Sequence, residues 1–283
     1  TFIDQKAAAL FGGGDDATML ANPISSEMSH LRPDLLPGLL QAAARNQARG
    51  QSDLALFEVG PAFTGGEPGE ERIQISGLLV NRNGPKDVHG ASRAMDVYDA
   101  KSDIETVLAA IGAPAKVQIL REGDAWWHPG RHGRICLGPK KTLGVFGELH
   151  PKVLIELGIK GTAVAFTIYP EDVPLPRKSG ASRGALDISD LQAVERDFAF
   201  VVDAGVEVLT LVNAAAGADK NLIEDVRVFD EFVGGSLGEN KKSLAITVRL
   251  QPQHKTLTEK DIEAVSDKIV AKVSKATGGE LRG

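Results

Sequence analysis

The last third of the chain contains the pattern that most restricts the fold. Between residues 243 and 251, the apolar side chains of Leu244, Ile246, Val248 and Leu250 alternate with small, polar or charged residues, which is typical of a strand with one buried face. A strand, a helix and another strand precede this segment, and a helix and a short strand follow it. The order β-α-β-β-α-β predicts a ferredoxin-like domain. The expected strands cover 198–202, 221–232, 243–251 and 280–282, and the expected helices cover 206–216 and begin again at Thr256.

The start of that last helix is predicted from a capping box. Thr256 and Glu259 have the spacing at which each side chain accepts a hydrogen bond from the backbone N–H of the other. Apolar residues then recur at helical spacing and predict the inner face of the helix: Ile262, Val265, Ile269 and Val273.

A segment rich in proline, glycine and serine divides the chain. Residues 170–190 have the composition of a linker. We therefore expect one domain over 1–180, a linker over 181–190 and a second domain over 191–283. The first domain is predicted to be a mainly antiparallel sheet with a few helices, which makes the whole chain α+β. Its expected strands are 54–59, 72–80, 116–120, 134–137, 142–147 and 162–169, and its expected helices are 4–11, 35–49, 96–111 and 151–157.

The helix that follows Pro33 is amphipathic. Leu35, Leu36, Leu39 and Leu40 recur at helical spacing, and Gly50 ends the helix. The resulting apolar stripe can pack against the sheet of its own domain or against another subunit. The pattern alone leaves both interpretations open.

Composition excludes several classes of protein. The 283 residues include 38 acidic and 32 basic side chains, for a net charge of −6, so any contact with nucleic acid must be local. No apolar run approaches the ~18 residues of a membrane-spanning helix. A single cysteine, Cys136, fits a reducing cytoplasm. Because the chain begins inside a predicted strand without an initiator methionine, we expect it to be a fragment of a longer polypeptide.

Motifs for metal binding and covalent catalysis are absent from the sequence. His128 and His132 have the spacing of a metal pair, but Pro129-Gly130 forbids the helix that would align them. The Gly triplet 12–14 is followed by two aspartates instead of Lys-Ser/Thr, so we interpret it as a turn and not a phosphate loop. Segment 126–130 (WWHPG) is expected to be a Pro-Gly turn anchored by buried indoles, with stacking on a base as the alternative.

Cations gather on or near one predicted hairpin of the second domain. They are Lys220, Arg227, Lys241, Lys242, Arg249 and Lys255. Such side chains can reach RNA phosphates. However, from residue 191 onward there are 12 Lys/Arg and 15 Asp/Glu, so a solvated surface without a ligand is the alternative.

A series of short segments, in a fixed order, covers nearly the whole chain. They are 22–29 (NPISSEMS), Leu31-Arg32, Leu39-Leu40, Asn46-Gln47, 56–60 (LFEVG), 96–105 (DVYDAKSDIE), His128-Pro129-Gly130, 147–151 (GELHP), Arg196-Asp197 and 242–246 (KSLAI). This ordered set resembles the β subunit of bacterial phenylalanine–tRNA ligase. One departure is Gln192, where a proline is common in that family.

The resemblance implies that residues 1–180 form a non-catalytic copy of the class II synthetase fold, with an antiparallel sheet and flanking helices. It also implies that 191–283 is a ferredoxin-fold anticodon-binding domain. The chain would be the C-terminal part of a β subunit, whose editing module lies upstream. Its partners would be the α subunit, in an α2β2 heterotetramer, and the tRNA for phenylalanine. ATP and Mg²⁺ would be used through the α subunit, and none would be bound by this fragment.

The same resemblance assigns the candidate sites. The motif 1 helix of class II enzymes lies at a subunit interface, which nominates Leu35, Leu36, Leu39 and Leu40. The expected tRNA contacts are Arg196, Arg227, Lys241, Lys242, Arg249 and Lys255.

The fragment alone is expected to be inactive. Class II catalysis needs an arginine two positions before a glutamate on the motif 2 strand; if Glu58 is that glutamate, the position holds Leu56, which cannot neutralise phosphate. Motif 3 has no counterpart in 158–169. Two alternatives remain: a free-standing RNA-binding module, and an independent ATP-using enzyme, against which Leu56 argues.

Overall fold

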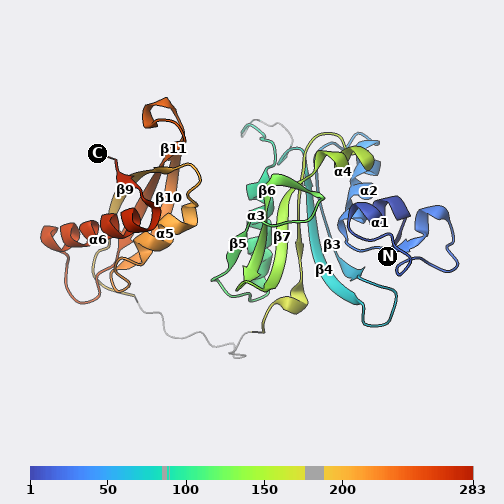
Figure 1. The fold of residues 1–283 in the computed structure, drawn as a ribbon, viewed down its shortest axis with the longest axis horizontal. Helices are drawn as coiled ribbons and strands as arrows, with labels where there is room; N and C mark the ends of the chain where they lie inside the picture. The colour runs from blue at the N-terminus through green and yellow to red at the C-terminus, as the bar shows by residue number, and fades with distance from the viewer. Residues whose placement is uncertain (85–87, 89, 176–187, 283) are drawn as a thin grey trace. The chain divides into compact units, whose positions relative to one another are not determined.

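The computed structural model describes residues 1–84, 88, 90–175 and 188–282. The chain forms two compact units, Thr1–Gly180 and Ala181–Gly283 (Figure 1). Most of the expected linker, residues 181–187, lies outside the described residues. Within the described part, no helix is both long and apolar enough to cross a lipid bilayer.

The first unit is built on a six-stranded antiparallel sheet. Its strand order is β3-β4-β8-β7-β6-β5, and a separate two-stranded sheet pairs β1 with β2. The strands are β1 (Phe2–Ile3), β2 (His30–Leu31), β3 (Leu54–Phe63), β4 (Glu71–Val80), β5 (Gln118–Leu120), β6 (Trp127–Leu137), β7 (Lys141–Leu149) and β8 (Ala163–Ile168). The helices are α1 (Gln5–Leu10), η1 (Ser26–Met28), α2 (Leu36–Gln47), α3 (Val97–Ala110), α4 (Pro151–Glu156) and η2 (Pro170–Asp172).

Two apolar clusters cover the two faces of this sheet. On one face, α2 and α4 pack over Leu78 and Ala165; on the other, α3 packs over Leu79 and Phe166 (Figure 1). Consecutive residues of β4 therefore belong to different cores, as the alternation of side chains along a strand requires. The expected α+β class and the antiparallel sheet are confirmed.

The segment around the two tryptophans differs from the expected Pro-Gly turn. Residues 127–137 form strand β6, and its register against β7 shifts between Trp127 and His132. Pro129 lies inside this irregularity, which accommodates a residue without a backbone donor. Trp127 is buried as expected, and the ring of Trp126 lies 5.4 Å from that of Phe11.

The second unit confirms the ferredoxin-like order. Its elements are β9 (Val194–Asp203), α5 (Val208–Ala216), β10 (Ile223–Phe232), η3 (Gly235–Leu237), β11 (Lys241–Leu250), α6 (Glu259–Thr277) and β12 (Glu280–Leu281). The antiparallel sheet has the order β10-β11-β9-β12. One apolar cluster joins this sheet to α5 and α6, and it contains Phe200, Ile246 and Val265.

The predicted capping box of α6 was two residues too early. Thr258 is the N-cap, its hydroxyl accepts a hydrogen bond from the backbone N–H of Asp261, and the Asp261 carboxylate accepts one from the N–H of Thr258. Thr256–Glu259 and Thr258–Asp261 have the same spacing. The choice between them depends on where the preceding loop ends, which the spacing does not encode.

Candidate nucleic-acid and subunit interfaces

Leu56, the residue expected at the position of the motif 2 arginine, lies on the edge strand β3. Leu56 packs against the core cluster beneath α2. Glu58, which points to the same face, accepts a hydrogen bond of 2.6 Å from Nη1 of Arg32, and Nε of Arg32 donates to the carbonyl oxygen of Pro61 at 2.9 Å. The guanidinium of Arg32 is thus buried and already bound within the chain.

Gly60 makes this arrangement possible. A Cβ atom at Gly60 would lie 2.7 Å from Nη2 of Arg32, a distance at which one of the two groups must move. The absence of a side chain at Gly60 therefore lets the Arg32 side chain lie close to β3. The backbone carbonyl of Arg32 also accepts a hydrogen bond from the N–H of Phe63, so Arg32 connects the end of β2 to β3.

Sequence reasoning missed a buried polar cluster at the start of α2. The backbone N–H groups of Leu35 and Leu36 donate to Oε1 of Gln74 (3.2 Å) and Oδ1 of Asp34 (2.8 Å). Burial raises the pKa of Asp34 to about 6, although the Leu36 N–H and the charge of Arg72 favour the ionised carboxylate. These bonds satisfy backbone donors that the first turn of a helix leaves free. An Asp directly before a pair of leucines was the available signal.

The cation beside Asp34 is held by an aromatic ring. The guanidinium carbon of Arg72 lies 3.6 Å from the ring centroid of Tyr169. Burial is also the main cause that raises the pKa of Tyr169, to about 12. Because the cation–π contact orients Arg72, this cluster anchors α2 to the end of the sheet.

The four leucines nominated for a subunit interface lie in the core. Leu35, Leu36 and Leu40 are 0% exposed and Leu39 is 5% exposed. These side chains are buried inside the first unit, which agrees with the expected packing of the helix on the sheet of its own domain. A partner on this helix would contact its outward residues, which include the exposed Arg45.

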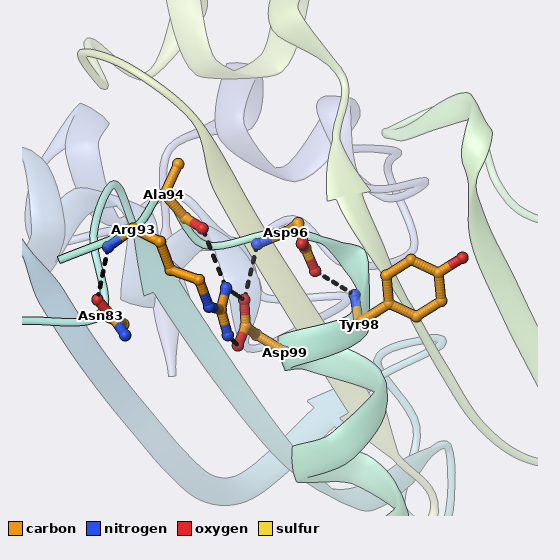
Figure 2. A network of polar contacts seen from close by, with 6 residues as sticks. All are labelled: Asn83, Arg93, Ala94, Asp96, Tyr98 and Asp99. Atoms are coloured by element: carbon orange, nitrogen blue, oxygen red, sulfur yellow. Dashed lines mark hydrogen bonds and ion pairs between the residues drawn. The ribbon is translucent and has the colours of Figure 1, made fainter. Parts of the chain in front are cut away.

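Two acidic residues of segment 96–105, Asp96 and Asp99, have structural roles (Figure 2). The Asp96 carboxylate accepts from the N–H of Tyr98, and Asp99 accepts from the N–H of Asp96, so the two form the capping box of α3. Both terminal nitrogens of Arg93 also bind the Asp99 carboxylate, at 2.7 and 2.5 Å. This hydrogen bonding is the main cause that lowers the pKa of Asp99. Tyr98 points away from the network and is 73% exposed.

Most of the nominated RNA-contacting cations are bound to acids. Nζ of Lys241 lies 2.7 Å from Asp203, and Nζ of Lys242, which is buried, lies 3.3 Å from Glu231. The remaining pairs join Nε of Arg249 to Glu224 at 2.6 Å, Nη1 of Arg249 to Glu195 at 3.6 Å, and Nζ of Lys255 to Asp261 at 3.3 Å.

The strand register divides these cations between the two sides of the sheet. Arg227, Lys241 and Arg249 share the face opposite the helices, whereas Arg196 and Lys242 belong to the face on which α5 and α6 pack, and Lys255 lies in a loop. Arg196 and Arg227 are exposed, and among the described residues neither forms an ion pair. The open face also carries Glu195, Asp197, Asp203 and Asp225, so it is not a continuous basic surface.

Among the described residues, no three or more His, Cys, Asp or Glu side chains are grouped closely enough to hold a metal ion. Nδ1 of His128 accepts from the N–H of Gly130, and Nδ1 of His132 lies 2.7 Å from the carbonyl oxygen of His128. Cys136 is buried.

Comparisons with known proteins match both units. The family model described as phenylalanyl tRNA synthetase beta chain CLM domain matches residues 1–169, and the ferredoxin-fold anticodon binding domain matches 189–282. The chain is 81% identical to the phenylalanine–tRNA ligase beta subunit of Ruegeria pomeroyi, 65% to that of Cereibacter sphaeroides and 48% to that of Paramagnetospirillum magneticum. Each match covers the whole of this chain and 36% of the relative.

Among solved structures, a pyrrolysyl tRNA synthetase from Desulfitobacterium hafniense is similar with a TM-score of 0.42 and 15% identity. That match covers 61% of this chain and 56% of the other.

Proposed function

The chain belongs to the phenylalanyl-tRNA synthetase β-chain family, and from this membership we propose that it forms part of a phenylalanine–tRNA ligase, where it assembles with the α subunit and contacts tRNA without catalysing the reaction. The observation that carries the proposal is the order of the two family matches, one on each unit of the fold. A free-standing RNA-binding module would leave the first unit without a role.

The proposed lack of catalysis rests on β3 and its neighbours. Leu56 supplies no charge, and the nearby guanidinium of Arg32 is bound to Glu58 and Pro61. Phosphoryl and acyl transfer need fixed donors that remain free for the substrate. The residues present do not fit ATP or Mg²⁺, and we assign both to the α subunit.

The proposed assembly is an α2β2 heterotetramer in the cytoplasm. We place the non-catalytic module over 1–180 and the anticodon-binding domain over 191–283, with the linker between them. For tRNA, Arg196 and Arg227 are the strongest of the nominated contacts because they are exposed and free of ion pairs among the described residues. Lys241, Lys242, Arg249 and Lys255 would first have to exchange a carboxylate for a phosphate.

Mixing the chain with the α subunit tests the proposal. We expect a stable complex by size-exclusion chromatography, and phenylalanine-dependent exchange of pyrophosphate into ATP only in samples that contain α. Exchange by the isolated chain would contradict the non-catalytic assignment. Failure to form a complex, with tRNA binding retained, would favour the free-standing module.

A further inference from the structure

Two loops at one end of the second unit line an open hollow, which contains Lys220 and Lys255 of the cations considered above. The loops are 217–222, between α5 and β10, and 251–258, between β11 and α6. The hollow has a volume of about 670 Å³, which lies within the usual range for a ligand site. Its lining is Lys220, Asn221, Leu222, Pro252, Gln253, His254, Lys255 and Leu257.

The lining combines cationic and polar groups with an apolar floor. Lys220 and His254 are exposed, and in the described part of the chain neither forms an ion pair. Lys255 shares its charge with Asp261 through two contacts of 3.3 Å. The nearby Asp219 is bound to Lys268 at 3.2 Å, and among the described residues it forms no ion pair with Lys220.

This arrangement contrasts with the hairpin. There, Lys241 and Arg249 lie against carboxylates at 2.7 and 2.6 Å, and a phosphate would have to displace them. At the hollow, Lys255 is held by contacts of 3.3 Å, as Lys242 is on the hairpin, but Lys220 forms no ion pair among the described residues. An incoming phosphate therefore meets less competition at the hollow.

We propose that this hollow binds a phosphodiester of the tRNA backbone, with Lys220 and Lys255 as the cationic contacts and His254 beside them. This inference rests on the proposed function, since it presumes that the second unit contacts RNA. Asn221 and Gln253 offer amide donors for phosphate or ribose oxygens. The apolar floor of Leu222, Pro252 and Leu257 can cover the adjoining sugar or base, which favours a nucleotide within a chain over a bare anion.

The test uses the full 283-residue chain and a fluorescently labelled transcript of the tRNA for phenylalanine. Affinity is measured at several salt concentrations for the unsubstituted chain, for Lys220→Ala, for Lys220→Ala/Lys255→Ala and for Lys272→Ala. Lys272 is an exposed lysine further along α6 and serves as a charge-matched control. Acylation of Lys220 by a succinimidyl ester, read by mass spectrometry, is followed with and without transcript, and with inorganic phosphate alone.

We expect Lys220→Ala to weaken binding about tenfold, as the loss of a charge-assisted contact predicts. The slope of log affinity against log salt should fall by about one for the single variant and about two for the double variant. Lys272→Ala should bind as the unsubstituted chain does, and the transcript should slow acylation of Lys220.

Three results would overturn the inference in distinguishable ways. If the unsubstituted chain binds the transcript but Lys220→Ala matches Lys272→Ala, the hollow is not the contact, and the proposed function stands. If inorganic phosphate protects Lys220 and the transcript does not, the hollow is a site for a free anion. If the unsubstituted chain does not bind the transcript at all, the inference and its premise both fail.

Discussion

At the scale of single residues, the ion pair between Arg32 and Glu58 makes the Arg32 guanidinium unavailable to a substrate. The side chain of Arg32 is 8% exposed and that of Glu58 is 35% exposed. Replacing the carboxylate by an amide leaves a buried guanidinium without its counter-charge. Arg32 is therefore a positioning residue for β2 and β3.

We expect Glu58→Gln to lower the free energy of unfolding of the first unit by about 2 kcal/mol. Urea denaturation followed by tryptophan fluorescence measures it, because both tryptophans lie in this unit. Glu156→Gln is the control, since the pair of Lys6 and Glu156 is exposed and should contribute nothing measurable. Equal midpoints for Glu58→Gln and Glu156→Gln would contradict the structural role of Arg32.

The buried Asp34 gives a pH dependence with a definite sign. Its pKa in the folded chain is about 6, above the ordinary 3.8, so the folded state binds more protons than the unfolded state between these values. Stability therefore falls as the pH rises from about 4 to about 6 and remains lower above that, by roughly 3 kcal/mol.

Asp34→Asn should remove this dependence, because the amide stays neutral and its oxygen can still accept from Leu36. We expect the variant and the unsubstituted chain to have similar stability at pH 3.5, and the variant to be the more stable at pH 7.5. Urea midpoints of the tryptophan signal at both pH values provide the measurement. A variant that is less stable at pH 7.5 would show that attraction to Arg72 outweighs the cost of burial.

At the scale of elements, sequence patterns were most informative where local chemistry decides the outcome. The alternation along β11 identified its buried face, and the element order identified the ferredoxin-like unit. Long-range packing was not accessible in the same way. Nothing in the spacing of Leu35, Leu36 and Leu40 distinguishes burial on the chain's own sheet from burial on a partner, and the register shift in β6 depends on pairing with β7.

The candidate sites show the same division. The hairpin cations were visible in the sequence, but their carboxylate partners were not, because Lys241 and Asp203 lie far apart along the chain and meet only through the register of β11 and β9. The acidic segment 96–105 matched the family, yet its first four residues act as a helix cap. Its role could have been predicted from Asp96 and Asp99, which have capping-box spacing.

The start of α6 offers a direct test of the corrected cap. We expect Thr258→Ala to destabilise the second unit by about 1 kcal/mol, as loss of an N-cap typically does, and Thr256→Ala to have no measurable effect. Because the second unit has no tryptophan, hydrogen exchange of the α6 amides, read by mass spectrometry, is the suitable probe. Faster exchange in Thr256→Ala than in Thr258→Ala would restore the earlier capping position.

At the scale of the whole molecule, the net charge of −6 opposes RNA at long range, so affinity must come from a few local contacts. Each phosphate neutralised contributes about −0.7 to −0.9 to the slope of log affinity against log salt. With the paired hairpin cations held by acids, the cations Arg196, Lys220, Arg227 and Lys255 remain for contact, and we expect a slope of about −3. A slope near −6 would mean that the ion pairs of the hairpin open on binding.

Arg227 and Arg249 lie on the same face of the sheet. Among the described residues Arg249 is bound to carboxylates, whereas Arg227 forms no ion pair. Arg227→Ala should weaken tRNA binding and lower the salt slope by about one without changing stability, because Arg227 has no ion pair among the described residues. Arg249→Ala should instead leave Glu195 and Glu224 without their shared partner and make the local charge near the RNA more negative by one unit. At low salt, the loss of affinity should therefore be larger for Arg227→Ala, which removes a phosphate contact, than for Arg249→Ala, which adds only repulsion that salt screens. Identical salt profiles for the two variants would show that carboxylate pairing does not determine which cations contact the tRNA.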